Sequence, residues 1–261
     1  MIITITNNKG GTGKSTTAQT LSIGLSLKGK KVLLIDFDPQ ANTTKTFNLK
    51  NSQNTITDVL SGKCNISDAI YQHKGIDIIP TNNNLLNIEI ILNSNKEYEF
   101  TKYKQLKMHL QQVSNYYDYI IIDTAPNLSL LTTNAIYSSD YVLIPLLADI
   151  YSIEGLATIN TQINKIKQGT DNQNVKISGL LITHYKAQTI VNQYLKDQLN
   201  NIARQLDTKI YKNVIRDSVV FSDSQASNDV CLLKYPTHNA SADYIGFIQE
   251  FLNDMEGNKN G

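Results

Sequence analysis

The sequence predicts an α/β fold, in which a mostly parallel, twisted sheet carries helices on both faces and residues 1–261 form a single domain. Three observations support this prediction. Strand-like and helix-like segments alternate along the chain, a glycine-rich loop joins the first strand to the first helix, and two apolar strands end in acidic residues. No Pro/Gly/Ser-rich linker interrupts the pattern, so we expect one domain.

The expected elements follow in chain order. Apolar residues at helical spacing, such as Ala18, Leu21 and Leu25, mark the first helix, and Gly29 between two lysines ends it. The weakly patterned regions 41–75 and 86–105 are expected to form short helices over the sheet edge. Apolar and β-branched runs predict strands at 2–6, 31–35, 76–79, 119–122, 141–146 and 176–183. Further helices are predicted at 102–114, 153–167, 188–206 and 241–252.

The glycine-rich loop, residues 8–16, reads Asn-Lys-Gly-Gly-Thr-Gly-Lys-Ser-Thr and predicts a phosphate-binding P-loop. Its glycines allow backbone N–H groups to turn toward phosphate oxygens, and the helix that follows adds its partial positive charge. Lys14 is the usual P-loop lysine and Ser15 the usual magnesium ligand. Lys9 is additional, and a second ammonium at a triphosphate site is costly unless it meets a negative charge. The residues expected to bind nucleotide are Lys9, Gly10, Gly11, Thr12, Gly13, Lys14, Ser15 and Thr16.

Acidic residues follow two of the predicted strands. The strand at 31–35 ends in Asp36-Phe37-Asp38, and the strand at 119–122 ends in Asp123. In open α/β sheets the carboxyl ends of the strands face the ligand, and an acid there can hold the hydrated magnesium that accompanies ATP. We expect Asp36 and Asp38 to diverge at the strand end, onto metal and water. Taken alone, Asp123 is equally well explained as a cap or turn residue.

Several stretches resemble the ParA-type ATPases of the deviant Walker A (ParA/MinD) family. The specific matches are Lys9–Thr16, Leu34–Asn42 and Tyr117–Pro126. Supporting matches lie at 142–146 and 152–156, with weaker ones at 215–216 and 239–244. These segments span the chain nearly end to end.

This resemblance implies a magnesium-dependent ATPase with slow basal turnover that binds ATP between two facing subunits. Lys9 would reach across the interface to the partner's phosphates, where a cation stabilises developing charge as an arginine finger does. Dimerisation would then depend on the γ-phosphate. The implied catalytic residues are Lys9, Lys14 and Asp38, the last orienting the attacking water. The implied magnesium site comprises Ser15, Asp36 and Asp123.

The family offers more than one biological role. The first is a plasmid or chromosome segregation ATPase that binds DNA nonspecifically when ATP-bound and is stimulated by a ParB-like centromere-binding protein. The second is a positioning ATPase for another cargo, such as a chemoreceptor array or carboxysome, or a MinD-like ATPase. The third is a non-switch enzyme, such as an amide-forming or biotin-pathway synthetase, against which Lys9 argues.

ATP is favoured over GTP, because the Asn-Lys-x-Asp motif of GTP-binding relatives is absent. By similarity, adenine contacts are expected after Thr183 and near 214–216. His184 could approach the base, although a structural role is the stronger hypothesis. Cys64 and Cys231 form no CxxC pair, so neither a metal site nor a disulfide is expected.

The formal net charge is only +1, so no basic field indicates nucleic acid. Each candidate DNA contact is more typical of a solvated surface charge than of a DNA contact. The candidates lie in the C-terminal third: Lys186, Lys196, Arg204, Lys212, Arg216 and Lys234. Because the first strand begins at residue 2, we expect no helix-turn-helix extension and no operator-specific repression.

The C-terminal segment 251–261 lacks the basic amphipathic character with which MinD-type relatives bind lipid. The sequence also has no signal peptide and no long apolar span. We therefore expect no membrane partner and a cytoplasmic protein that associates with the nucleoid in its ATP-bound form.

Overall fold

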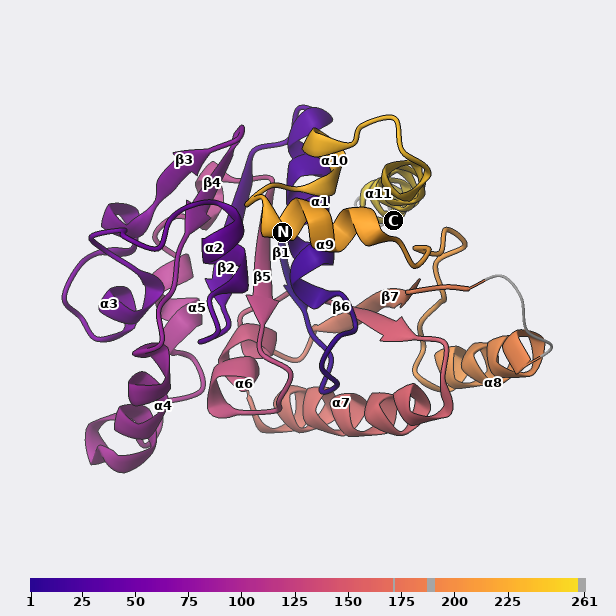
Figure 1. Ribbon diagram of the computed structural model, residues 1–261. Coiled ribbons are helices and arrows are strands. Elements are labelled where there is room, and N and C mark those ends of the chain that lie inside the picture. Colours follow the sequence, from indigo (N-terminus) through magenta and orange to yellow (C-terminus); the bar gives the residue numbers. More distant parts are fainter. Residues whose placement is uncertain (171, 187–190, 258–261) are drawn as a thin grey trace.

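A seven-stranded sheet forms the centre of the computed structural model, which describes residues 1–170, 172–186 and 191–257. Of residues 150, 151, 153, 154 and 191–197 only the backbone is described. The strand order is β3-β4-β2-β5-β1-β6-β7, with β3 antiparallel to β4 and the other neighbours parallel (Figure 1). The strands are β1 (Ile2–Ile5), β2 (Val32–Phe37), β3 (Tyr71–His73), β4 (Ile76–Ile79), β5 (Tyr119–Thr124), β6 (Tyr141–Leu147) and β7 (Lys176–Thr183).

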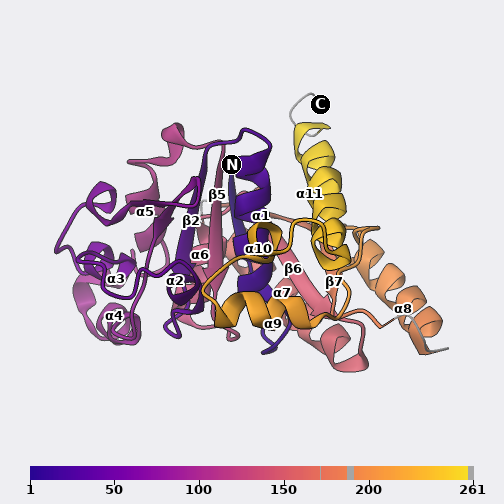
Figure 2. The same ribbon diagram turned by 45° about the horizontal axis from the view of Figure 1, so that its top comes forward.

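Helices cover both faces of this sheet, as Figure 2 shows. On one face α1, α10 and α11 pack together, and their apolar residues share a core with the central strands. On the other face α3 to α6 form a second core, and α7 and α8 form a third over β6 and β7. The larger helices are α1 (Lys14–Leu27), α4 (Leu85–Ser94), α6 (Leu130–Tyr137), α7 (Ile150–Gly169), α8 (Val191–Gln205), α9 (Val219–Ala226) and α11 (Asn239–Gly257). The short ones are α2 (Asn42–Thr46), α3 (Ile56–Leu60), η1 (Ile66–Ala69), η2 (Lys96–Tyr98), α5 (Gln105–Leu110), η3 (Ser114–Tyr116) and α10 (Cys231–Lys234).

The predicted α/β architecture is confirmed, but three of the described helices, α6, α9 and the short α10, were missing from the prediction. All eight residues of α6 are buried, so this helix has no polar face and lacks the amphipathic pattern that predicts a surface helix. Helix α9 follows Ile215 and Arg216 and lies across the first turns of α1, where Figure 1 shows it in front. Only the tertiary structure reveals that α9 borders the site described below.

The end of β2 also differs from the prediction. Pairing with β5 continues to Phe37, so Asp36 lies inside the strand and not after it. The register places Asp36 directly beside Asp123 of β5. The apolar run at 31–35 therefore did not predict the end of β2, because backbone pairing with β5 continues beyond that run.

Candidate nucleotide site

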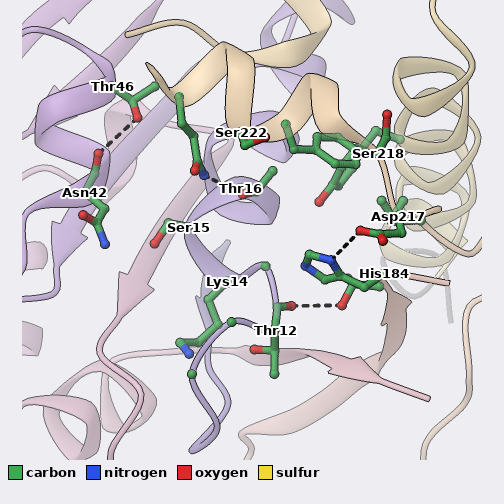
Figure 3. Close-up of a pocket in the computed structure, with 18 of the residues that line it drawn as sticks. Thr12, Lys14, Ser15, Thr16, Asn42, Thr46, His184, Asp217, Ser218 and Ser222 are labelled. Atoms are coloured by element: carbon green, nitrogen blue, oxygen red, sulfur yellow. Dashed lines mark hydrogen bonds and ion pairs between the residues drawn. The ribbon is translucent and has the colours of Figure 1, made fainter. Parts of the chain in front are cut away.

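The P-loop connects β1 to α1 and forms one end of a cavity of about 740 Å³ (Figure 3). Gly11 and Gly13 adopt φ angles of 71° and 73°, in the left-handed region that favours glycine. A side chain added at Gly10 or Gly11 would meet open space, so the loop backbone borders the cavity directly. The first turn of α1 begins at Lys14, and the unpaired N–H groups of a helix start bind anions. This geometry suits a chain of phosphates.

Lys14 is buried at this end of the cavity, with 7% of its surface exposed. Its Nζ donates a hydrogen bond to the carbonyl oxygen of Lys9 at 2.9 Å. Burial lowers the pKa of Lys14, and the charges of Asp123 and Asp38 oppose that shift. A phosphate group in the cavity would supply the negative charge that stabilises the ammonium form.

Asp36 and Asp123 form a fully buried carboxyl pair on neighbouring strands. Asp36 Oδ2 accepts hydrogen bonds from the backbone N and Oγ1 of Thr44, both at 2.7 Å, and Asp123 Oδ2 accepts one from Thr43 Oγ1 at 2.7 Å. Burial raises the pKa of Asp36 to about 6 and that of Asp123 to about 8, and the adjacent Asp36 carboxylate adds to the second shift. Without a compensating cation, the two carboxyls favour sharing a proton at neutral pH.

This pair fits a magnesium ion. Within the described part of the chain, no group donates a hydrogen bond to Asp123 Oδ1, although the atom is buried. Ser15, at the start of α1, borders the cavity, and its hydroxyl lies close enough to Asp123 to oppose the rise in the pKa of that carboxyl. Mg²⁺ prefers such oxygen ligands and retains several of its waters. When bound, the ion would neutralise charge on the terminal phosphates, while Ser15, Asp36 and Asp123 hold it directly or through water.

Asp38 lies just beyond β2, borders the cavity and is 5% exposed. Its backbone N donates to Asp36 Oδ1 at 3.2 Å, and its Oδ1 accepts from the backbone N of Gln40 at 2.9 Å. These local bonds fix the carboxyl at the phosphate end of the cavity. This position is compatible with the predicted role of Asp38, which is to orient a water molecule beside the terminal phosphate.

Lys9 does not border the cavity formed by its own P-loop, whose lining begins at Gly10. Its Nζ instead forms an ion pair with Asp149 Oδ2 at 2.6 Å, and the two side chains are 33% and 32% exposed. Asp149 also caps α7, since its Oδ1 accepts from the backbone N and Oγ of Ser152 at 2.8 and 2.9 Å. Burial acts to raise the pKa of Asp149, but the bonds from Lys9 and Ser152 outweigh it and lower the pKa.

Sequence reasoning did not identify Asp149, although an aspartate just before a helix with Ser three residues on is a recognisable N-cap. Helix α7 also approaches the P-loop closely. A Cβ on Gly155 would lie 2.6 Å from Asn8 Oδ1, so a larger residue there would displace the Asn8 side chain. Lys9 and the start of α7 thus form one connected unit.

The other end of the cavity is bordered by the residue after β7, by the segment 215–219 and by α9. Thr183 Oγ1 donates to the carbonyl oxygen of Thr12 at 3.0 Å, and Gln225 Nε2 donates to Thr16 Oγ1 at 3.0 Å. These bonds join the C-terminal third of the chain to the P-loop. The regions predicted to contact adenine do border the cavity.

The five candidate DNA contacts whose side chains the structure describes do not form one unpaired basic patch. Lys186 pairs with Asp217 at 3.3 Å, and Lys234 pairs with Asp223 at 2.6 Å. Arg216 makes a two-pronged pair with Asp243, at 2.6 Å from Nε and 2.7 Å from Nη2. Arg204 and Lys212 are exposed, and the side chain of Lys196 lies outside the described residues. Within the described part of the chain, no cluster of His, Cys, Asp and Glu forms a further metal centre.

The fold and the site together define a P-loop ATPase. The profile of the AAA_31 family, described as AAA domain, matches residues 1–177. Sporulation initiation inhibitor protein Soj of Bacillus subtilis is 33% identical over 95% of this chain and 97% of its own length. Chromosome partitioning protein ParA of Caulobacter vibrioides is 30% identical over 96% of this chain and 93% of its own. A putative plasmid partition protein from Borrelia burgdorferi, solved with AMPPNP, is 31% identical with a TM-score of 0.79, over 97% of this chain and 98% of that chain.

The chain therefore belongs to the ParA-type partition ATPases. Solved structures with this fold hold an ATP analogue, in one case together with magnesium. The open P-loop and the buried carboxyl pair of this chain fit ATP and Mg²⁺.

Proposed function

We propose that this protein is a nucleotide-dependent switch for DNA segregation. Two ATP-bound copies pair face to face and bind DNA nonspecifically. A ParB-like partner then stimulates slow, magnesium-dependent hydrolysis and so releases the pair. We place the protein in the cytoplasm, associated with the nucleoid while ATP is bound.

The observation that carries this proposal is the position of Lys9. This lysine borders the P-loop but not the cavity of its own chain, and it remains partly exposed at the surface. Released from Asp149, its ammonium would reach the phosphates of a second copy, where it would stabilise charge developing during phosphoryl transfer. Within each copy, Lys14 contacts the phosphates, Asp38 orients the water, and Ser15, Asp36 and Asp123 hold magnesium.

A MinD-like membrane role finds less support. Helix α11 packs its apolar face into the core through Phe247, Phe251 and Met255, which leaves that face unavailable to lipid. Over the described residues, none of the helices combines the length and apolar character needed to cross a bilayer. Positioning of a cargo other than DNA would use the same chemistry and stays the alternative.

Sedimentation velocity with ATP, with ADP and without nucleotide tests the proposal, each repeated with nonspecific duplex DNA. We expect a dimer only with ATP, and DNA binding only by that dimer. Lys9→Ala should keep nucleotide binding, because Lys14 and the loop backbone remain, but should lose the ATP-dependent dimer. A Lys9→Ala protein that dimerises like the wild type would refute the role of Lys9 in pairing. A dimer that forms with ATP but does not bind DNA would favour the alternative function, the positioning of another cargo.

A further inference from the structure

Beyond the P-loop, the wall of the nucleotide cavity contains a histidine in an uncommon backbone conformation. His184 directly follows β7 and has φ 50°, in the left-handed region that residues other than glycine seldom adopt. Contacts on either side maintain it. Thr183 Oγ1 donates to the carbonyl oxygen of Thr12 at 3.0 Å, and the backbone N of Tyr185 donates to the carbonyl oxygen of Ile215 at 2.9 Å. His184 consequently borders the cavity, and Figure 3 shows its ring there beside Asp217.

Asp217 determines which ring nitrogen of His184 carries the proton. His184 Nδ1 lies 3.1 Å from Asp217 Oδ1, and Lys186 lies 3.3 Å from Asp217 Oδ2. The hydrogen bond from His184, followed by that from Lys186, lowers the pKa of Asp217. An ionised carboxylate only accepts hydrogen bonds, so Nδ1 must be the donor. In a neutral ring Nε2 is then an acceptor.

This acceptor borders the part of the cavity that remains for the purine base once the phosphates are placed. Phosphates belong at the end formed by Gly10–Thr16, where the loop backbone and Lys14 lie. The part bordered by His184 and the segment 215–222 is left for the sugar and the base. Adenine carries an amino group at position 6, which donates a hydrogen bond, whereas guanine and hypoxanthine carry an oxygen there, which accepts one.

We propose that His184, with its proton held on Nδ1 by Asp217, accepts a hydrogen bond from the 6-amino group of adenine through Nε2 and thereby selects ATP over 6-oxopurine nucleotides. A 6-oxo group at the same place would set two acceptors against each other and leave both unsatisfied. Ser218 and Ser222 also border the cavity, but a hydroxyl can donate or accept and so cannot separate the two bases. This inference concerns nucleotide choice alone and holds whatever cargo the protein moves.

Calorimetric titration with ADP and with IDP at pH 8, in the presence of Mg²⁺, tests the proposal. The diphosphates avoid turnover and ATP-dependent pairing, and the two bases differ only at position 6 and its adjacent ring proton. We expect the wild type to bind ADP about tenfold more tightly than IDP. His184→Asn should reduce that ratio to within about twofold, because asparagine tolerates a positive φ and its amide can turn either its donor or its acceptor to the base.

Asp217→Asn provides an independent variant that leaves the histidine in place. The new amide can bond Nδ1 as donor or acceptor, so the proton is free to move to Nε2 and the preference for ADP should fall several-fold. Ser222→Ala, from the same wall, is the control and should keep the wild-type ratio. Equal affinity of the wild type for ADP and IDP would overturn the proposal. So would a His184→Asn protein that loses affinity for both nucleotides in parallel. Should His184→Asn fail to fold, an unchanged ratio in Asp217→Asn would overturn it.

Discussion

Replacing Asp149 by Asn tests whether the ion pair within each copy restrains Lys9. Asparagine is also a good N-cap, so α7 should keep its start while the ion pair between Lys9 and residue 149 is lost. Because both side chains are about one-third exposed, solvent screens the pair, which is worth at most about 1 kcal/mol. If Lys9 must leave Asp149 to reach a second copy, each dimer breaks two such pairs. Their loss should favour the ATP-bound dimer by up to about 2 kcal/mol, or about thirtyfold in Kd.

Sedimentation equilibrium of Asp149→Asn with a non-hydrolysable ATP analogue measures this shift, since hydrolysis cannot then deplete the dimer. With ADP the variant should remain monomeric, because no γ-phosphate is present to receive Lys9. Ser152→Ala is the matched control: it removes a hydroxyl that donates to Asp149 but leaves the ion pair. A dimer of Asp149→Asn no tighter than that of the wild type would refute the idea that this pair restrains Lys9.

Three further outcomes are expected. Asp38→Ala should still form the ATP-dependent dimer but release phosphate at least tenfold more slowly; normal release would exclude Asp38 as the group that orients water. Folding raises the pKa of Asp123 from 3.8 to about 8, so the folded protein binds more protons than the unfolded chain between these values. Stability of the metal-free protein should therefore fall as pH rises from about 4 to about 8, and Asp123→Asn should flatten this slope in urea titrations. If the free energy of unfolding of Asp123→Asn falls with pH as steeply as that of the wild type, another group causes the pH dependence. Asp243→Asn should release Arg216 and raise DNA affinity several-fold at low salt, whereas Arg216→Glu should lower it. If a filter-binding assay gives both variants the DNA affinity of the wild type, Arg216 does not contact DNA.

The P-loop could be predicted from the sequence because its geometry is local. Gly11 and Gly13 have the positive φ angles that the motif requires, and the helix that follows the loop starts at Lys14. The alternation of strands and helices was equally informative. It predicted the parallel sheet correctly, since apolar runs such as 119–122 are buried on both faces.

Contacts between distant segments required the tertiary structure. Lys9 and Asp149 are 140 residues apart, and no periodicity in the chain relates them. The pairing of Asp36 with Asp123 depends on the register of two strands joined by a long connection, and that register raises the pKa values of both acids. Similarly, the charge of Arg216 suggested a DNA contact. Only the tertiary structure shows that Arg216 pairs with Asp243, which lies on α11.

The sequence by itself determined the class of chemistry, because the conformation of the glycine-rich loop and the charges of its lysine and of the acids near the strand ends follow from the local sequence. The tertiary structure decided the partners of those groups: which carboxylate pairs with Lys9, which acids lie side by side, and which ring nitrogen of His184 meets Asp217. The physical reason is that burial and pairing set the charge state of a side chain, and both depend on neighbours that lie far away along the chain.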